Sequence, residues 1–452
     1  MRDSQHLVQS DNLLATLHKA LDAGTFRQVR EMFNTLPPAE IAHLIESSPP
    51  RSRNVLWALI EPNCEGDVLQ YLNDEVRSAF IKQMDTDALV AVTEGLDADD
   101  IVDILQSLPD QVTDKVLQTM GGQDRQRIQK ILAYPEDSAG GLMNTDTITV
   151  RPDVTLDVVL RYLRLRGQIP DTTDKLLVVD RKDKFIGHLA LTDLLTQDPS
   201  LTVSEVMDCD APIVPADLPA TDVANLFQRQ DLISAAVVDA EGRLLGRITI
   251  DDVVDVIRDE ADHSLLSLAG LDDTEDTFGN IIGSAKRRAI WLGINLLTAL
   301  LASSVIGAFD ATIQQIVALA VLMPIVASMG GIAGSQTLTL VIRGMALGHV
   351  SEGNSRWLLG KELAVGTLNG LLWAVVVASV AALWFQDVHL GAIIAVAMLV
   401  NLMIAALAGV SLPLLMQRFN IDPALAGSVV LTTITDVVGF ATFLGLATLL
   451  LI

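Results

Sequence analysis

Residues 425–452 read LAGSVVLTTITDVVGFATFLGLATLLLI, a long apolar run in which Asp436 carries the only charge. A helix needs about 20 apolar residues to cross the roughly 30 Å hydrocarbon core of a bilayer. Four more apolar runs lie upstream, at 289–309, 312–342, 358–386 and 389–416. Residues 284–452 are therefore predicted to form an α-helical membrane domain with five spans.

Basic residues between these runs predict how the domain is oriented. Lys286, Arg287 and Arg288 precede the first run, whereas the first and third connections contain no Lys or Arg. The other basic residues around the connections are Arg343, Arg356, Lys361 and Arg418. Because basic loops tend to stay in the cytoplasm, we expect residues 1–283 in the cytoplasm and the C-terminus on the outer side. The N-terminus has no apolar stretch of signal-peptide length, so no export signal is predicted there.

The acidic charge of the chain is concentrated in the part that precedes the membrane domain. The whole chain has 31 Lys and Arg against 56 Asp and Glu, a net charge of −25; residues 1–283 carry −26 and residues 284–452 carry +1. A chain that is 50% hydrophobic is not of the disordered class, and its acidity excludes a basic nucleic-acid binder. The seven histidines are scattered, and the HExxH, GxSxG and P-loop patterns do not occur, so no enzyme is predicted.

A 12-residue repeat runs from residue 30 to residue 133. Nine positions spaced by 12 are all apolar: Met32, Leu44, Leu56, Val68, Phe80, Val92, Ile104, Val116 and Ile128. The residue four places later is apolar in every copy except one, where it is Ser48. An apolar pair that recurs in this way, with turn residues such as Pro37-Pro38 between copies, predicts short stacked helices. Residues 1–133 are therefore predicted to form an all-α superhelix.

A second repeat follows the first and is longer. The segment VVDRKDKFIGHLALTDLL at 178–195 matches VVDAEGRLLGRITIDDVV at 237–254. Each copy predicts a strand, a charged turn, a second strand and a helix that begins near an Asp. The pair resembles the tandem cystathionine-β-synthase (CBS) module, an α/β fold, here at 134–200 and 201–258. An acidic helix predicted at 259–283 would connect this module to the first span.

Asp436 is the candidate with the clearest chemical meaning. It lies about 11 residues into the last run, roughly 16 Å along a helix and hence near mid-bilayer. Ser428, Thr432, Asp436 and Gly439 share one helix face. A carboxylate at this depth costs at least about 2.5–3.5 kcal/mol and normally faces a wet cavity or a partner. We interpret it as part of an ion pathway; a protonated or hydrogen-bonded carboxyl packed against a neighbouring span is the structural alternative.

Two further patterns have both a functional and a structural explanation. Pro324, Gly330, Gly331 and Gly334 predict a break in the second span, and such a break is tolerated only where freed carbonyl groups are buried or line a wet cavity. Close packing through small residues explains the same pattern without an ion. Acidic clusters at 97–103 and 251–262 are usually solvated surfaces, although a hard divalent cation can bridge carboxylates across a domain junction.

Taken together, these features resemble the MgtE family of CBS-regulated magnesium channels over nearly the whole chain. The matching segments are YPEDSAGGLM at 134–143, DDVVDVI at 251–257, the glycines at 330–334, DPAL at 422–425 and Thr435-Asp436. The resemblance implies a homodimer in the bacterial inner membrane, with a pore between the second and fifth spans. In that pore, Asp436 of both subunits would hold a hydrated Mg²⁺. Pore-lining candidates are Gly330, Gly331, Ile332 and Thr432.

The resemblance also implies regulation by the transported ion. Cytoplasmic Mg²⁺ would bind between the helical domain, the CBS pair and the connecting helix, and would favour the closed pore. The positions that match sensing acids are Asp67, Asp99, Asp103, Asp231, Asp252, Asp255 and Glu260. Because some members of the family look like ATP-binding proteins at the CBS pair, the resemblance implies ATP as a second ligand here. The implied partners are the lipid bilayer and a second copy of the chain, and no nucleic-acid partner is expected.

The sequence departs from the family pattern at a few positions. Ile332 stands where the family usually has Asn, which predicts looser selectivity, so that Co²⁺ or Mn²⁺ also passes. Pro219 and Thr221 replace acids of the second CBS copy, and His263-Ser264 replaces an acidic pair on the connecting helix. These changes predict weaker closure by Mg²⁺.

Two other functions stay open at this point. A coupled divalent-cation exporter would need more titratable groups within the spans than Asp436 alone. A membrane-anchored ion or nucleotide sensor without flux would tolerate the loss of Asp436.

Overall fold

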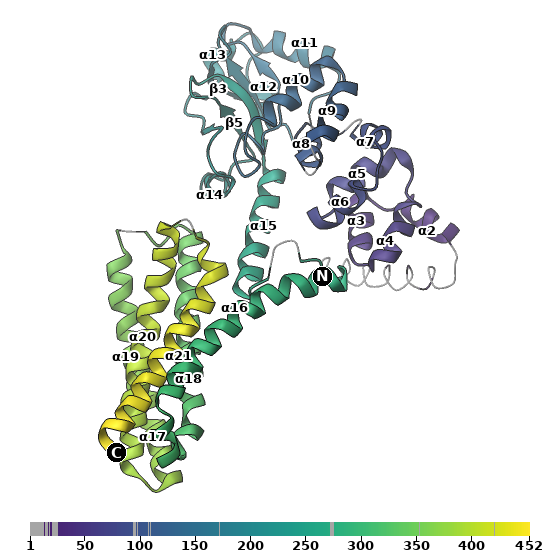
Figure 1. The fold of residues 1–452 in the computed structure, drawn as a ribbon. Helices are drawn as coiled ribbons and strands as arrows, with labels where there is room; N and C mark the ends of the chain where they lie inside the picture. The colour runs from purple at the N-terminus through teal and green to yellow at the C-terminus, as the bar shows by residue number, and fades with distance from the viewer. Residues whose placement is uncertain are drawn as a thin grey trace. The chain divides into compact units, whose positions relative to one another are not determined.

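Two separately packed units make up the chain: residues 1–261 with 274–280, and residues 262–273 with 281–452 (Figure 1). The structure is a computed structural model. It describes residues 13, 17, 19 and 26–452, except for 94, 95, 97, 107, 109, 171, 272–274, 352 and 420. The side chains at 98–100, 103, 110, 111, 123 and 124 also lie outside this description.

Short helices form the start of the first unit, as the 12-residue repeat predicts. They are α2 (Phe26–Phe33), α3 (Pro38–Glu46), α4 (Pro50–Trp57), α5 (Glu65–Gln70), α6 (Asp74–Ile81), α7 (Thr86–Thr93), α8 (Ala98–Gln106), α9 (Asp110–Thr119) and α10 (Gly122–Ile131). Each helix contributes one residue of the nine-position series. Eight of the nine are buried, Met32 being half-buried, so the predicted helical repeat is confirmed. The exceptional Ser48 is buried as well, and its hydroxyl donates to the Leu44 carbonyl at 2.8 Å.

Close packing between repeats leaves no room for a side chain at Gly66 on α5. A Cβ there would lie 2.3 Å from the main-chain oxygen of Val92 on α7. We expect Gly66→Ala to lower the free energy of unfolding of this region by about 1–3 kcal/mol, because overpacking must move backbone. Gly122→Ala on α10 is the matched control, since its Cβ would meet nothing within 4 Å. Hydrogen exchange of α5 and α7 amides in the full chain measures both; equal effects of the two changes would contradict the prediction.

Two three-stranded sheets follow, one for each copy of the second repeat. In the first, β1 (Thr149–Val150) is parallel to β2 (Lys175–Val179), which is antiparallel to β3 (Phe185–Ala190). In the second, β4 (Ile213–Pro215), β5 (Ser234–Val238) and β6 (Leu244–Thr249) repeat this order. The accompanying helices are α11 (Leu156–Arg166), α12 (Leu191–Thr196), α13 (Val203–Val206) and α14 (Ala220–Gln230). The predicted α/β pair is thus confirmed.

The two copies use equivalent residues in equivalent ways. Val178 pairs with Gly187 in one sheet and Val237 pairs with Gly246 in the other. Asp180 accepts main-chain hydrogen bonds from residues 182 and 184 at 2.8 and 2.9 Å, and Asp239 accepts them from residues 241 and 243 at 3.0 and 2.8 Å. Short polar side chains that bond nearby amides stabilise tight turns. The match between the two sequence segments therefore reflects a repeated hairpin.

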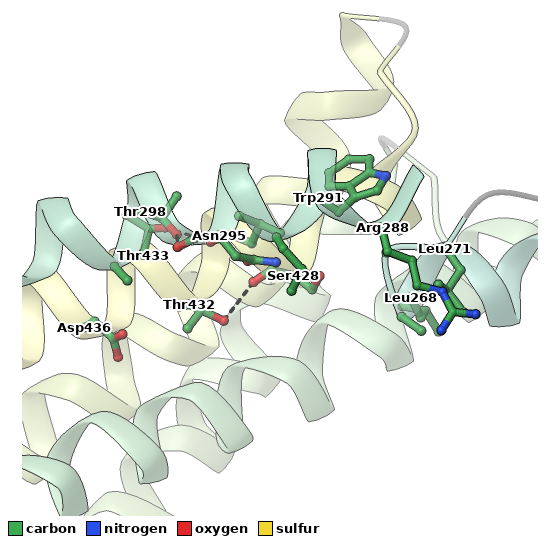
Figure 2. A pocket seen from close by; sticks show the side chains of 15 residues that line it. Leu268, Leu271, Arg288, Trp291, Asn295, Thr298, Ser428, Thr432, Thr433 and Asp436 are labelled. Carbon is green, nitrogen blue, oxygen red and sulfur yellow. Dashed lines mark hydrogen bonds between the residues drawn. The ribbon is translucent and has the colours of Figure 1, made fainter. Parts of the chain in front are cut away.

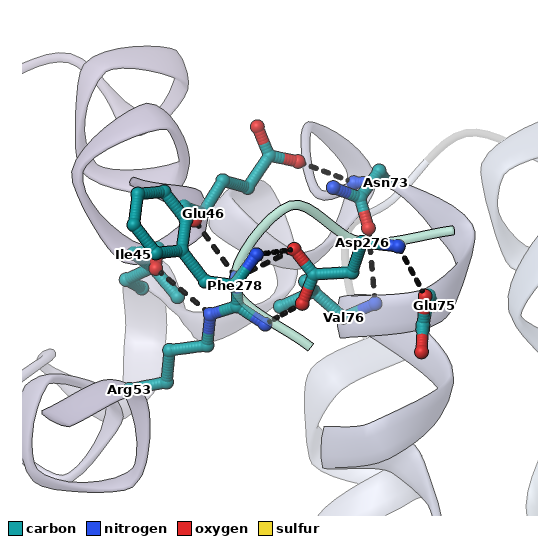
Figure 3. Close-up of polar contacts among 8 residues, drawn as sticks. All are labelled: Ile45, Glu46, Arg53, Asn73, Glu75, Val76, Asp276 and Phe278. Carbon is teal, nitrogen blue, oxygen red and sulfur yellow. Dashed lines mark hydrogen bonds and ion pairs between the residues drawn. The ribbon is translucent and has the colours of Figure 1, made fainter. Parts of the chain in front are cut away.

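A buried ion pair attaches residues 275–280 to the helical repeat (Figure 3). The guanidinium of Arg53, on α4, binds both carboxylate oxygens of Asp276, with Nη2 to Oδ1 at 3.0 Å, and the two side chains are 8% and 7% exposed. Arg53 also donates to the carbonyls of Ile45 and Glu46 at 3.2 and 2.8 Å. The Asp276 amide donates to Glu75 at 2.9 Å. This loop is therefore part of the first unit, although it lies close in sequence to the first membrane helix.

The connecting helix differs from its predicted bounds. It is α15 (Ile250–Leu268), so it continues directly from the last strand and does not extend to residue 283. Gly270 has a φ of +70°, its amide donates to the Ser267 carbonyl at 2.9 Å, and the Leu271 amide donates to the Leu266 carbonyl at 2.9 Å. This is the Schellman arrangement that commonly ends a helix at glycine. The prediction of a helix over 259–283 was wrong because it overlooked this C-cap.

Five long apolar helices form the second unit, as predicted. They are α16 (Ile281–Ala308), α18 (Ala318–Ala346), α19 (Ser355–Phe385), α20 (Val388–Arg418) and α21 (Pro423–Leu451). A short helix, α17 (Asp310–Gln315), separates α16 from α18, so the second span begins later than residue 312. The central helix is α20, which packs against α18, α19 and α21, and 61% of the residues in its most apolar stretch are buried. By contrast, α16 packs against α21, and only 6% of the residues in its most apolar stretch are buried.

The expected break in the second span is absent, because α18 is one helix from Ala318 to Ala346 with Pro324 inside it. Two of its glycines serve close packing instead. A Cβ at Gly330 would lie 2.2 Å from the side chain of Asn401 on α20, and one at Gly334 would lie 3.0 Å from Leu431 on α21. Of the two explanations left open by the sequence, packing through small residues is the correct one at these two positions.

Candidate ion pathway

Asp436 lies beside a polar hollow in the second unit (Figure 2). The hollow has a volume of about 380 Å³ and is lined by α16, α21 and residues 268–271. Figure 2 shows Asp436 towards one end and Arg288 towards the other, with Asn295 and Thr298 of α16 between them. The carboxylate therefore faces space that water can occupy rather than a sealed helix contact.

A second, more open groove lies on the other side of the same residues, between α18 and α21. It is lined by Ala327, Ser328, Gly331, Ile332, Ser335, Gln336 and Thr339 of α18, and by Thr432 and Asp436 of α21. The α18 wall thus combines hydroxyl and amide groups with two small residues and Ile332. Because Thr432 and Asp436 line both spaces, α21 places them between α16 and α18.

Three of the four predicted pore-lining residues share this groove with Asp436. Gly331, Ile332 and Thr432 line it, and Ile332 is 55% exposed. Gly330 does not line it, because it is buried against Asn401. The pore-lining role of all four residues stays a prediction. The side of α18 that carries Gly330 is covered by α20, whereas Gly331 has nothing within 4 Å of its Cβ position. Gly439, expected on the polar face, is likewise buried against Asn401.

The chemistry of the groove suits a hydrated cation. Asp436 is the one acidic side chain among the described residues that line the groove or the hollow. The hydroxyl of Thr432 donates to the Ser428 carbonyl at 2.9 Å, which leaves its oxygen as an acceptor on the groove side. Mg²⁺ gives up its water reluctantly and is often held by one or two carboxylates through its remaining water shell. One carboxylate with surrounding hydroxyl groups can bind such an ion without removing its water shell.

Two buried polar residues of the spans were missed by sequence reasoning. Glu362 on α19 is 4% exposed; its carboxylate binds Lys361 Nζ at 2.6 Å and accepts from Thr337 of α18 at 3.4 Å. Asn401 on α20 is fully buried. Asp436 is the one titratable group that the sequence places near mid-bilayer; Glu362 lies seven residues after the start of α19 and is buried among the helices. A charged pair inside the third apolar run was the available signal.

The predicted sensing acids lie in the first unit at separate places. Asp67 on α5, Asp231 at the end of α14, and Asp255 and Glu260 on α15 are exposed. Asp252 is half-buried and accepts hydrogen bonds from the amide and hydroxyl of Thr249 at 3.2 and 3.0 Å. Asp99 and Asp103 belong to α8, but their side chains are outside the described part. Within the part that the structure describes, no three of the Asp, Glu, His and Cys side chains are close enough to hold a metal ion.

One of these acids is held in an environment that disfavours its charge. The pKa of Asp255 is raised because neighbouring atoms displace part of its water; Arg258 opposes this rise, Asp251 adds to it, and Arg77 opposes it. A carboxylate in such a position gains from a cation placed beside it. The carboxylate oxygens of these acids are the ligand type that a hard divalent ion prefers. Among the described residues, however, no three such side chains lie close enough together to bind one ion.

Similarity to known proteins follows the same division of the chain. The family model of the MgtE intracellular N domain matches residues 36–137, and the CBS domain model matches 139–199 and 203–259. The model described as a divalent cation transporter matches residues 323–446. A magnesium transporter MgtE of Thermus thermophilus is 30% identical over 98% of this chain and 99% of its own length, and one of Bacillus subtilis is 26% identical over 97% of each.

A crystal structure of the cytosolic domain of the Mg²⁺ channel MgtE in complex with ATP is 32% identical, with a TM-score of 0.49. It covers 54% of this chain and 99% of that one.

A helical repeat and a CBS pair joined to five candidate membrane helices, with a carboxylate in a polar groove, are features of a membrane transport protein. The family matches specify the class further. The chain belongs to the MgtE family of magnesium transporters.

Proposed function

We propose that the protein is a passive Mg²⁺ channel of the bacterial inner membrane, closed by cytoplasmic Mg²⁺. The observation that carries this proposal is the polar groove between α18 and α21 with Asp436 on its wall. The relatives of the chain that are named magnesium transporters support the choice of ion. The first unit would lie in the cytoplasm and the C-terminus outside, since the connections on one side of the membrane are basic.

A homodimer would complete the pathway. The groove is more open than the hollow, and a second copy of the chain would cover it and contribute a second Asp436. Two carboxylates around one hydrated Mg²⁺ would balance its charge, and the small residues of α18 would leave space for its water shell. Ile332 adds an apolar surface to this groove, so the proposed selectivity is looser, with Co²⁺ or Mn²⁺ also passing.

Gating would use the acidic surplus of the first unit. Carboxylates of Asp67, Asp99, Asp103, Asp231, Asp252, Asp255 and Glu260 would bind regulatory Mg²⁺ once the helical repeat and the CBS pair close together. Mg²⁺ screens the negative charge of residues 1–283, and the change would reach the membrane unit along α15. ATP at the CBS pair would be a second regulatory ligand.

Mg²⁺ uptake into liposomes that contain the purified full chain tests the proposal. We expect uptake driven by the Mg²⁺ gradient alone, with suppression when Mg²⁺ is raised on the side that carries the first unit. If the flux does not change with the Mg²⁺ concentration on that side, the proposed closure by cytoplasmic Mg²⁺ is wrong. No flux under any gradient would favour the sensor without transport.

A coupled exporter is the second candidate, and Glu362 is the observation that favours it. Proton-coupled transport needs titratable groups inside the spans, and this buried carboxylate joins Asp436 there. Transport of Mg²⁺ against its gradient, driven by an imposed pH difference, would select the exporter. Uptake that is independent of the pH difference would select the channel.

Replacing His263 and Ser264 by acids should strengthen closure by Mg²⁺. His263 Nε2 lies 3.2 Å from Asp422 Oδ2 at the start of α21, so carboxylates at 263 and 264 would create a more acidic cluster next to that helix. We expect His263→Glu with Ser264→Asp to lower the Mg²⁺ concentration for half-closure several-fold in the liposome assay, since added carboxylates raise affinity for a divalent cation. His263→Gln with Ser264→Asn is the uncharged control. An unchanged half-closing concentration in the acidic variant would contradict the prediction.

A further inference from the structure

Asn401 is a fully buried amide near the middle of α20, the central helix of the membrane unit. Its Nδ2 donates a hydrogen bond of 2.8 Å to the main-chain carbonyl of Val326 on α18. Val326 lies two residues after Pro324, which has no amide to donate within its own helix. Pro324 leaves the carbonyl of Ala320 without its helical donor, not that of Val326, so the Asn401 bond is an additional link between α20 and α18.

Two glycines make room for this amide. A Cβ at Gly330 of α18 would lie 2.2 Å from Asn401 Nδ2, and a Cβ at Gly439 of α21 would lie 2.9 Å from the same atom. Real Cβ atoms essentially never approach heavy atoms closer than 3.0 Å. The amide thus occupies a point where α18, α20 and α21 meet.

The two helices held in this way are the walls of the candidate ion pathway. Gly330 directly precedes Gly331, which lines the groove, and Gly439 follows Asp436 by three residues. A side chain that contacts both Gly330 and Gly439 therefore constrains the position of the α18 groove wall relative to the Asp436 carboxylate on α21. Asn401 itself lines neither the groove nor the hollow.

If position 401 only filled space between the helices, an apolar side chain would do so at a lower free-energy cost than asparagine. Asn401 Oδ1 is buried without a hydrogen-bond partner among the described residues. An unsatisfied polar group costs free energy in a protein interior, and water is not available in lipid to satisfy it. The amide is therefore poorly suited to be a simple space-filler, and its bond to Val326 is the feature that a leucine could not supply.

We propose that Asn401 is a positioning residue for the ion pathway. Its amide, wedged between Gly330 and Gly439 and bonded to the Val326 carbonyl, sets the separation of α18 and α21 and thereby the selectivity of the groove among divalent cations. This proposal rests on the proposed transport function.

Asn401→Leu in the full chain tests it, because leucine keeps the approximate volume and removes both polar atoms. We expect a folded protein whose Mg²⁺ flux in liposomes falls by about 10–100-fold, the range seen when residues that support a metal site are replaced. The ratio of Mg²⁺ to Co²⁺ flux should change as well, which a loss of folded protein would not produce. Thr435→Val is the matched control: Thr435 is equally buried on α21, and its hydroxyl bonds to its own helix at 3.0 Å.

A second pair of variants separates hydrogen bonding from packing. Gly330→Ala should reduce flux because its methyl group displaces the amide, whereas Gly360→Ala, whose Cβ meets nothing within 4 Å, should not. Gly330→Ala with Asn401→Ala removes the clash but also the bond to Val326. We expect this double variant to fold and to stay impaired; full recovery of flux and ion ratio would show that Asn401 only fills space and would overturn the proposal.

The two proposals fail in different ways. If wild-type protein transports and requires Asp436, but Asn401→Leu retains both the flux and the ion ratio, the positioning role is wrong. If wild-type protein carries no flux, the transport function is wrong instead.

Discussion

Asp436→Asn is expected to reduce Mg²⁺ uptake to the level of liposomes without protein. The substitution keeps the shape of the side chain and removes its negative charge. Among the described residues that line the groove and the hollow, no other acidic side chain can replace it. In a low-dielectric membrane, a divalent cation without a counter-charge faces a large electrostatic barrier, so flux should be lost while folding is retained.

Asp387→Asn provides the matched control for this experiment. Asp387 is the N-cap of α20, where its carboxylate accepts from the amides of His389 and Leu390 at 2.8 and 3.3 Å. Asn caps helices about as well as Asp, so this variant should fold and transport normally. Equal flux in the Asp436→Asn variant and wild type would remove Asp436 from the pathway and, with it, the main support for the proposed channel.

The second large effect is expected at Arg53, in the first unit. Arg53→Met leaves the Asp276 carboxylate buried without its cation, which typically costs about 3–5 kcal/mol. Amides of α3 and α4 should then exchange with solvent on the order of 100- to 1,000-fold faster, since each 1.4 kcal/mol is a factor of ten. Hydrogen exchange of the full chain followed by mass spectrometry measures this locally, which matters because a chain with several domains does not unfold in one step.

Two further variants show whether the burial of the pair is responsible. Arg27→Met removes the partner of Glu31 in a pair whose side chains are 91% and 64% exposed, and it should change exchange rates little, since exposed pairs contribute little. Arg53→Met with Asp276→Leu removes both charges and should recover much of the loss. Exchange in α3 and α4 that is as slow in Arg53→Met as in wild type would mean that the ion pair does not hold residues 275–280 in place.

Patterns that depend on neighbouring residues were predicted correctly. The 12-residue period places one apolar residue on the buried side of each short helix, and Leu44, Leu56 and Val68 are buried as expected. The matching segments at 178–195 and 237–254 contain two hairpins with the same register. Five apolar runs correspond to five long helices. Local periodicity and run length are sufficient here, because the side-chain spacing of a helix or strand is set by its own backbone.

The errors arose where the same residues allow two structures. Glycines at 330–334 fit a broken helix and a tightly packed one equally well, and the contact with Asn401, about 70 positions along the chain, decides for packing. The C-cap at Gly270 was readable in principle, since glycine after an apolar helix is a stop signal.

The sequence alone therefore determined the number of spans, the two repeats and the carboxylate in the last span, because each is written in a local pattern of residue types. Only the tertiary structure decided which face of α18 lines the groove, that Glu362 and Asn401 are buried, and that Arg53 binds Asp276 across 223 positions of sequence. These features depend on which distant segments meet. Such contacts are selected by the packing of whole helices, and no local period of the sequence encodes them.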